Sequence, residues 1–128
     1  MSYYFSKSLD KSFEDAILQT TDSLQKEGFG VLSEIRIDLK LKEKLGVEFP
    51  RYIILGACNP ALAYKALTVE NKIGTMLPCN IIVQESGPQR VEVTAVDPVA
   101  SMKAIENPAL IKIASEVAEK LRNVIAGL

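Results

Sequence analysis

Three Asx-Pro dipeptides constrain this chain more than any other feature of its sequence: Asn59-Pro60, Asp97-Pro98 and Asn107-Pro108. An Asn or Asp side chain caps the free N–H groups at the start of a helix, and proline is well suited to the position that follows because its φ is already near the helical value. Each dipeptide therefore predicts a helix that begins at its proline. The second and third predicted helices of this kind follow each other closely, and the last is the longer.

Apolar spacing predicts the extent of the helices. In the first, Ser12 is the expected N-cap, Phe13, Ile17 and Leu24 recur on one stripe, and Gly28 ends the helix. A short charged helix is expected over residues 39–45, closed by Gly46. Residues 60–68 and 108–125 are the other predicted helices, and residues 69–77 are predicted to form a loop.

Five segments are predicted to be strands, at residues 3–8, 29–38, 51–58, 79–85 and 90–96. The last two flank Ser86-Gly87-Pro88-Gln89 and should form a hairpin. In the strand 29–38, Val31, Ile35 and Ile37 fall on one side, so only one face of the sheet is expected to be buried, as is typical of antiparallel sheets.

These elements predict one α+β domain over residues 1–128. We expect a curved, mainly antiparallel sheet of about five strands, covered on one face by the first and last helices. The predicted core consists of Phe13, Ile17, Leu24, Ile53, Leu55, Ile82, Val93, Val117 and Leu121.

Composition narrows the classes of function. The 15 basic and 16 acidic residues nearly balance, so no nucleic acid or anionic membrane is expected as a partner. The chain has no histidine, which excludes histidine-based catalysis and histidine-ligated metals. No segment resembles a signal peptide, and no apolar run approaches the roughly 20 residues of a membrane span, so we expect a cytoplasmic location.

The two cysteines are the only residues that suggest chemistry. Cys58 lies in Gly56-Ala57-Cys58-Asn59-Pro60, and Cys79 lies in Leu77-Pro78-Cys79-Asn80. Cys58 directly precedes a helix N-terminus, an environment that lowers the pKa of a thiol. If the two strands are antiparallel neighbours, both cysteines lie at the same end of the sheet. We therefore expect Cys58, Asn59, Cys79 and Asn80 to form a ligand or cofactor site.

Several functions are compatible with that site. Cys58 and Cys79 would bind a soft metal, with help from Met76 or Met102, or would cycle between dithiol and disulfide. The pocket would otherwise take an anion at the helix N-terminus or a small thiol-reactive ligand. Cys58 as the nucleophile of an enzyme, with Lys65 as the nearest cation along the chain, is an alternative. A third alternative is a structural or regulatory dimer in which both cysteines are inert packing groups, because free cysteine is commonly buried.

The two cysteine motifs also carry a resemblance. Together with Ile73-Gly74, Val91-Glu92-Val93, Asp97-Pro98 and Met102, they resemble the prokaryotic family called domain of unknown function 302 over essentially the whole chain. The chain departs from the family pattern at Asn71, where members often have proline. The resemblance implies a small α+β domain that forms homodimers, with its two motif cysteines at Cys58 and Cys79 and with no established activity or cofactor.

A homodimer is also expected from the strand 90–96. Its second face, which carries Arg90, Glu92, Thr94 and Val96, is only moderately polar. A sheet face of this kind has to be covered or charged, and pairing with a second copy would cover it.

Overall fold

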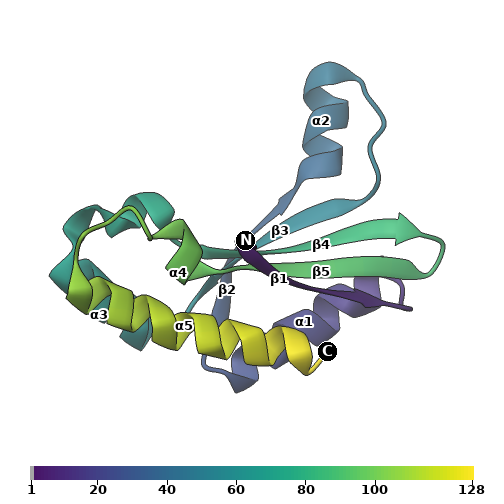
Figure 1. Cartoon of the computed structure of the whole chain (residues 1–128). Coiled ribbons are helices and arrows are strands. Elements are labelled where there is room, and N and C mark those ends of the chain that lie inside the picture. The colour runs from purple at the N-terminus through teal and green to yellow at the C-terminus, as the bar shows by residue number, and fades with distance from the viewer. Residues whose placement is uncertain (1) are drawn as a thin grey trace.

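One antiparallel sheet organises the chain, as the computed structural model of residues 2–128 shows (Figure 1). Its strand order is β1-β5-β4-β3-β2, and every neighbouring pair is antiparallel. The strands are β1 (Tyr4–Leu9), β2 (Gly30–Arg36), β3 (Tyr52–Cys58), β4 (Cys79–Gly87) and β5 (Arg90–Val96). The helices are α1 (Phe13–Lys26), α2 (Ile37–Leu45), α3 (Pro60–Val69), the 3-10 helix η1 (Asn71–Met76), α4 (Pro98–Ser101) and α5 (Pro108–Ala126).

The first and last long helices cover one face of the sheet, as predicted. In Figure 1, α1 and α5 lie below the sheet, whereas α2 stands away from it on the other side. The α+β class, the five strands and the hairpin between β4 and β5 are confirmed. The main core contains Phe13, Leu24, Leu55, Val93 and Leu121, each at most 2% exposed.

Three predicted core residues are less buried than expected. Ile17 and Val117 lie only partly buried at the margin of the core. The prediction that Ile82 faces the core is wrong. Its neighbours Ile81 and Val83 are fully buried, so Ile82 points to the uncovered face of the sheet. All three residues of this run are apolar, so alternation could not identify the buried face.

Local capping explains why most helix boundaries were predicted. The side chains of Asn59, Asp97 and Asn107 each accept a backbone N–H from the first turn of the helix that follows, and Ser12 does the same for α1. At the other end of α1, Gly28 has a positive φ of 84°. The N–H of Gly28 donates to the Gln25 carbonyl and that of Phe29 to the Leu24 carbonyl, which is a Schellman motif.

Two segments differ from the prediction. The predicted strand 29–38 ends at Arg36. A bulge between Val31 and Ser33 changes the face of the sheet to which the following side chains point. The next helix begins at Ile37 because Asp38 turns inward, where it accepts two hydrogen bonds from Arg36, of 2.9 and 2.7 Å, and the Tyr52 N–H at 3.2 Å. The predicted loop 69–77 contains the 3-10 helix η1, which buries Ile73.

No helix within residues 2–128 is both long enough and apolar enough to cross a membrane.

Candidate functional site

The two cysteines lie at the same end of the sheet, on antiparallel neighbours, as expected. Cys58 is the last residue of β3 and Cys79 is the first of β4. The register partner of Cys79 is Ala57, however, not Cys58. Because successive side chains of a strand leave opposite faces, this offset of one residue means that the two cysteines are not direct partners across the strands. Cys79 is buried and Cys58 is half-buried.

The prediction that the cysteines act as a pair is not supported. Both are free thiols. Within residues 2–128 there is also no group of three or more Cys, Asp or Glu side chains that could hold a metal ion. The spacing of the cysteines in the sequence does not reveal which residue faces which across two strands, so the offset between them could not be predicted.

The environment of Cys79 disfavours the thiolate that a redox or metal-binding thiol needs. Burial raises the pKa of the Cys79 thiol to about 11, and the nearby Cys58 contributes in the same direction. The thiolate is the nucleophile and the metal ligand, so Cys79 is held in its unreactive form at neutral pH. This shift is opposite to the lowered thiol pKa that a redox or metal-binding pair predicts.

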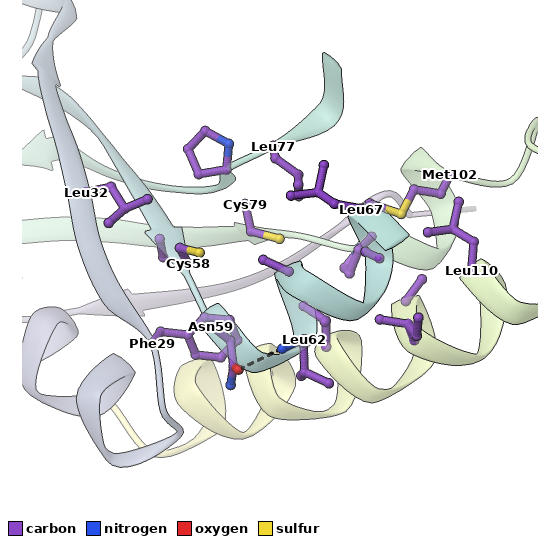
Figure 2. Close-up of a pocket in the computed structure, with 18 residues that line it drawn as sticks. Phe29, Leu32, Cys58, Asn59, Leu62, Leu67, Leu77, Cys79, Met102 and Leu110 are labelled. Carbon is purple, nitrogen blue, oxygen red and sulfur yellow. Dashed lines mark hydrogen bonds between the residues drawn. The ribbon is translucent and has the colours of Figure 1, made fainter. Parts of the chain in front are cut away.

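The N-terminus of α3 has partners for most of its free N–H groups within the protein. Asn59 Oδ1 accepts the Leu62 N–H at 3.3 Å (Figure 2). Asn59 Nδ2 donates to the Glu27 carbonyl at 3.4 Å. Pro60 has no N–H, so the Ala61 N–H is the one donor of the first three positions left without such a partner. Asn59 therefore acts as a helix cap and a tie to the end of α1, and the terminus offers little to an anion.

A cavity of about 290 Å³ opens at this end of the sheet, and both cysteines line it. Figure 2 shows Leu32 and Cys58 on one side of it and Met102 and Leu110 on the other. The walls come from the end of the sheet, from α3, from the segment before β4, and from α4 and α5. Its lining residues are Phe29, Leu32, Ala57, Cys58, Asn59, Leu62, Ala63, Ala66, Leu67, Leu77, Pro78, Cys79, Pro98, Met102, Leu110, Ile113, Ala114 and Val117.

The lining is almost entirely apolar. None of these described residues is charged, and the polar groups are the Asn59 amide and the two thiols. Small side chains on α3 and α5, including Ala63, Ala66 and Ala114, leave the space that larger residues would fill. Leu32 and Leu67 line the cavity although they are 69% and 42% exposed, so its mouth is apolar as well.

A close backbone contact holds the segment that leads into β4. A Cβ on Gly56 would lie 2.7 Å from Pro78 Cγ and 2.3 Å from Ser33 Oγ. Only glycine at position 56 lets the Pro78 ring approach β3 this closely. Pro78 follows a cis peptide bond and forms part of the cavity wall, so Gly56 helps to determine the shape of the cavity.

A second hollow of about 240 Å³ adjoins the first. Pro78, Cys79, Pro98 and Met102 line both. Its remaining lining residues are Met76, Asn80, Val96 and Ser101. Of the four predicted site residues, Cys58, Asn59 and Cys79 thus line the larger cavity, while Asn80 lines the hollow beside it.

Most of the cavity was invisible in the sequence. Leu110, Ile113 and Ala114 on α5 read as ordinary core positions of an amphipathic helix. Only the packing of α5 against α3 shows that these side chains border empty space. The available signal was the run of small residues on α3, which indicates a thin helix face but does not say what lies beside it.

Comparisons with known proteins identify a family. The sequence profile of "Domain of unknown function DUF302" matches residues 5–128, so the chain belongs to this family. The chain is also similar to a solved structure, "Crystal structure of uncharacterized conserved protein DUF302 from Bacillus stearothermophilus". The two share 27% identity with a TM-score of 0.90, over 98% of each chain. No curated protein matches the sequence.

Proposed function

We propose that this domain binds a small, neutral, predominantly apolar molecule in the cavity between α3, α5 and the end of the sheet. The observation that carries the proposal is the cavity itself, which is about 290 Å³ in volume and lined by apolar side chains. Sites for small molecules are typically concave and mostly apolar, with few polar groups. The cap at Asn59 and the lack of a charged side chain among the described lining residues favour a binding function over catalysis.

The size and polarity of the cavity restrict the ligand. An engineered apolar cavity of about 150 Å³ in another protein binds benzene, so a volume near twice that suits a molecule of about eight to ten carbon atoms. A charged ligand would have to lose its hydration without gaining an ion pair, because no charged side chain among the described residues lines the cavity. The ligand should therefore be neutral.

Titration with ethylbenzene, followed by NMR, tests this proposal. We expect saturable shifts of the amide signals of α3 and α5, and we expect the substitution Ala63→Leu to weaken binding at least tenfold because the larger side chain fills the cavity. Ala61→Leu is the matched control, since Ala61 is exposed on the same helix and does not line the cavity. Absence of saturable binding, or equal weakening by the two variants, would contradict the proposal.

We also propose that a second copy of this chain covers the outer face, defined here by Ile35, Ile54 and Ile82. These three side chains lie side by side on β2, β3 and β4, opposite the face that α1 and α5 cover. Ile35 is 44% exposed, and none of the three is fully buried. An apolar row of this kind is typical of an interaction surface.

The segment from α2 to residue 51, called the arm below, supplies the complementary surface. It projects from the sheet in Figure 1. Its side chains Leu39, Leu45, Val47 and Phe49 are 44–70% exposed. A chain that carries both an uncovered apolar face and a projecting apolar arm can satisfy both through a two-fold interface, in which each arm reaches the other copy.

Sedimentation velocity checks the dimer. We expect a dimer for the unaltered protein and a monomer for Ile54→Glu, which places a charge in the middle of the outer face. Leu18→Glu is the control, because Leu18 is 65% exposed on α1, away from the outer face. A monomer at all concentrations, or a dimer that Ile54→Glu leaves intact, would exclude this interface.

A further inference from the structure

We infer that the bound molecule is amphipathic, with its apolar body in the larger cavity and an uncharged polar head group in the second hollow, at Asn80. This inference rests on the proposed function and adds the chemical class of the ligand. It follows from three observations: the two hollows share a wall, the wall contains a flexible side chain, and the second hollow offers a free amide that the first does not.

The two hollows share four lining residues. Pro78, Cys79, Pro98 and Met102 border both hollows, which therefore adjoin each other at these side chains. Pro78 and Pro98 have rigid rings, and Cys79 is fixed at the start of β4. Met102 lies just after the short helix α4 and is 5% exposed. With three rotatable bonds, methionine is the one member of the wall able to change its conformation around a ligand.

The second hollow differs from the first in its polar groups. Asn80 is exposed on β4, and its side-chain amide makes no hydrogen bond to any residue in the described part of the chain. Asn59, the corresponding amide in the larger cavity, uses both ends as a helix cap and as a donor to Glu27. An amide can donate to and accept from a ligand head group at the same time. Asn80 is therefore suited to a carboxamide, hydroxyl or carbonyl.

Charge decides which head groups are acceptable. The residues that line the second hollow include no lysine or arginine, so a carboxylate would gain no counter-ion there to offset the part of its hydration that it loses. A neutral head group needs only the hydrogen bonds that Asn80 offers. We therefore expect the protein to prefer an amide to the carboxylate of the same size and shape.

Three probes with one aromatic body test the inference: ethylbenzene, 3-phenylpropanamide and 3-phenylpropanoate, each titrated against the protein and followed by NMR. We expect the amide to bind at least tenfold more tightly than the carboxylate. We expect Asn80→Leu to weaken the amide at least tenfold and to change the affinity for ethylbenzene less than twofold. Asn71→Leu is the matched control, since Asn71 is an exposed asparagine on η1 that lines neither hollow.

The outcomes separate the two proposals. If ethylbenzene binds and Asn80→Leu leaves the amide affinity unchanged, or lowers both affinities equally, the head-group site is wrong while the apolar cavity stands. The same holds if the carboxylate binds as tightly as the amide. If ethylbenzene does not bind, the proposed function is wrong and the head-group site is excluded with it.

Discussion

The two ends of the helix-covered face of the sheet are built in opposite ways. At one end, Phe13 is 2% exposed and lies beneath the guanidinium groups of Arg36 and Arg51, which are 5.0 and 5.1 Å from its ring centroid. At the other end, around Cys58 and Cys79, alanines and prolines leave a cavity. A large aromatic ring covered by cations leaves no room for a ligand, whereas small residues backed by two helices leave an apolar space.

Charge is divided between the ends in the same way. Arg51 makes ion pairs with Glu14 and Glu85, and Arg36 makes one with Asp38, all at the end that contains Phe13. At the other end, no charged side chain lines the cavity among the residues that the structure describes. The comparison shows that one end of the sheet is filled by a large side chain and ion pairs, whereas the other end leaves an apolar cavity.

Removal of the aromatic ring should have the largest effect. Phe13→Ala should lower the free energy of unfolding by about 3–5 kcal/mol, because it deletes a buried ring and leaves a cavity behind. Urea denaturation measures this change. Phe49→Ala is the control, since Phe49 is 46% exposed on the arm, and it should have a much smaller effect on unfolding of the monomer. Equal losses for the two variants would show that Phe13 has no special place in the core.

A methyl group at Gly56 should disturb the end with the cavity. Gly56→Ala places a Cβ 2.7 Å from Pro78 Cγ, so we expect a loss of about 1–3 kcal/mol of stability, as is usual for overpacking. The measurements are urea denaturation and ethylbenzene affinity, both of which should fall. Gly30→Ala is the control, because a Cβ there has no heavy atom within 4 Å. If Gly56→Ala alters neither quantity, the Pro78 segment does not determine the shape of the cavity.

The ion pair of Asp38 should make a smaller, pH-dependent contribution. The hydrogen bonds from Arg36 hold the pKa of Asp38 below its ordinary value of 3.8. A carboxyl with a lowered pKa stabilises the folded state above its unfolded pKa, and this stabilisation is lost as the pH falls through the folded pKa. At pH 7, Asp38→Asn should therefore cost about 1.5 kcal/mol, the lower end for a charged hydrogen bond because Arg36 is partly exposed.

Urea denaturation of Asp38→Asn and the unaltered protein across pH 2–7 checks this contribution. The difference should be constant near neutrality and should shrink below about pH 4. Glu43→Gln is the control, because Glu43 and its partner Lys40 are 66% and 58% exposed and such pairs contribute little. A difference that does not depend on pH would mean that the charge of Asp38 is not what stabilises α2.

Burial should slow the reaction of Cys79 with alkylating reagents in the folded protein. With a pKa of about 11, only about one Cys79 thiol in a thousand is ionised at pH 8, against about a quarter for a thiol with the ordinary pKa of about 8.5. In a Cys58→Ser variant, alkylation by iodoacetamide at pH 8 should be far slower in the folded protein than in urea. Mass spectrometry measures both rates, and equal rates would show that burial does not protect Cys79.

The sequence alone determined the local features of this protein. The caps at Ser12, Asn59 and Asn107 act within one helical turn, so the residues that define each helix start are adjacent in the chain. The hairpin between β4 and β5 is equally local, and the length of its turn was enough to predict it. The antiparallel character of the sheet followed from the amphipathic strands, whereas the strand order β1-β5-β4-β3-β2 was not predicted.

Only the tertiary structure decided the features that depend on contacts between distant segments. The register of β3 against β4 pairs Cys79 with Ala57, so the two cysteines that similar motifs suggested as a pair are not direct partners across the strands. The buried face of β4 was undetermined because Ile81, Ile82 and Val83 are all apolar. The cavity was undetermined for the same reason: an apolar side chain has the same sequence signature whether it contacts another side chain or borders a space that a ligand can enter.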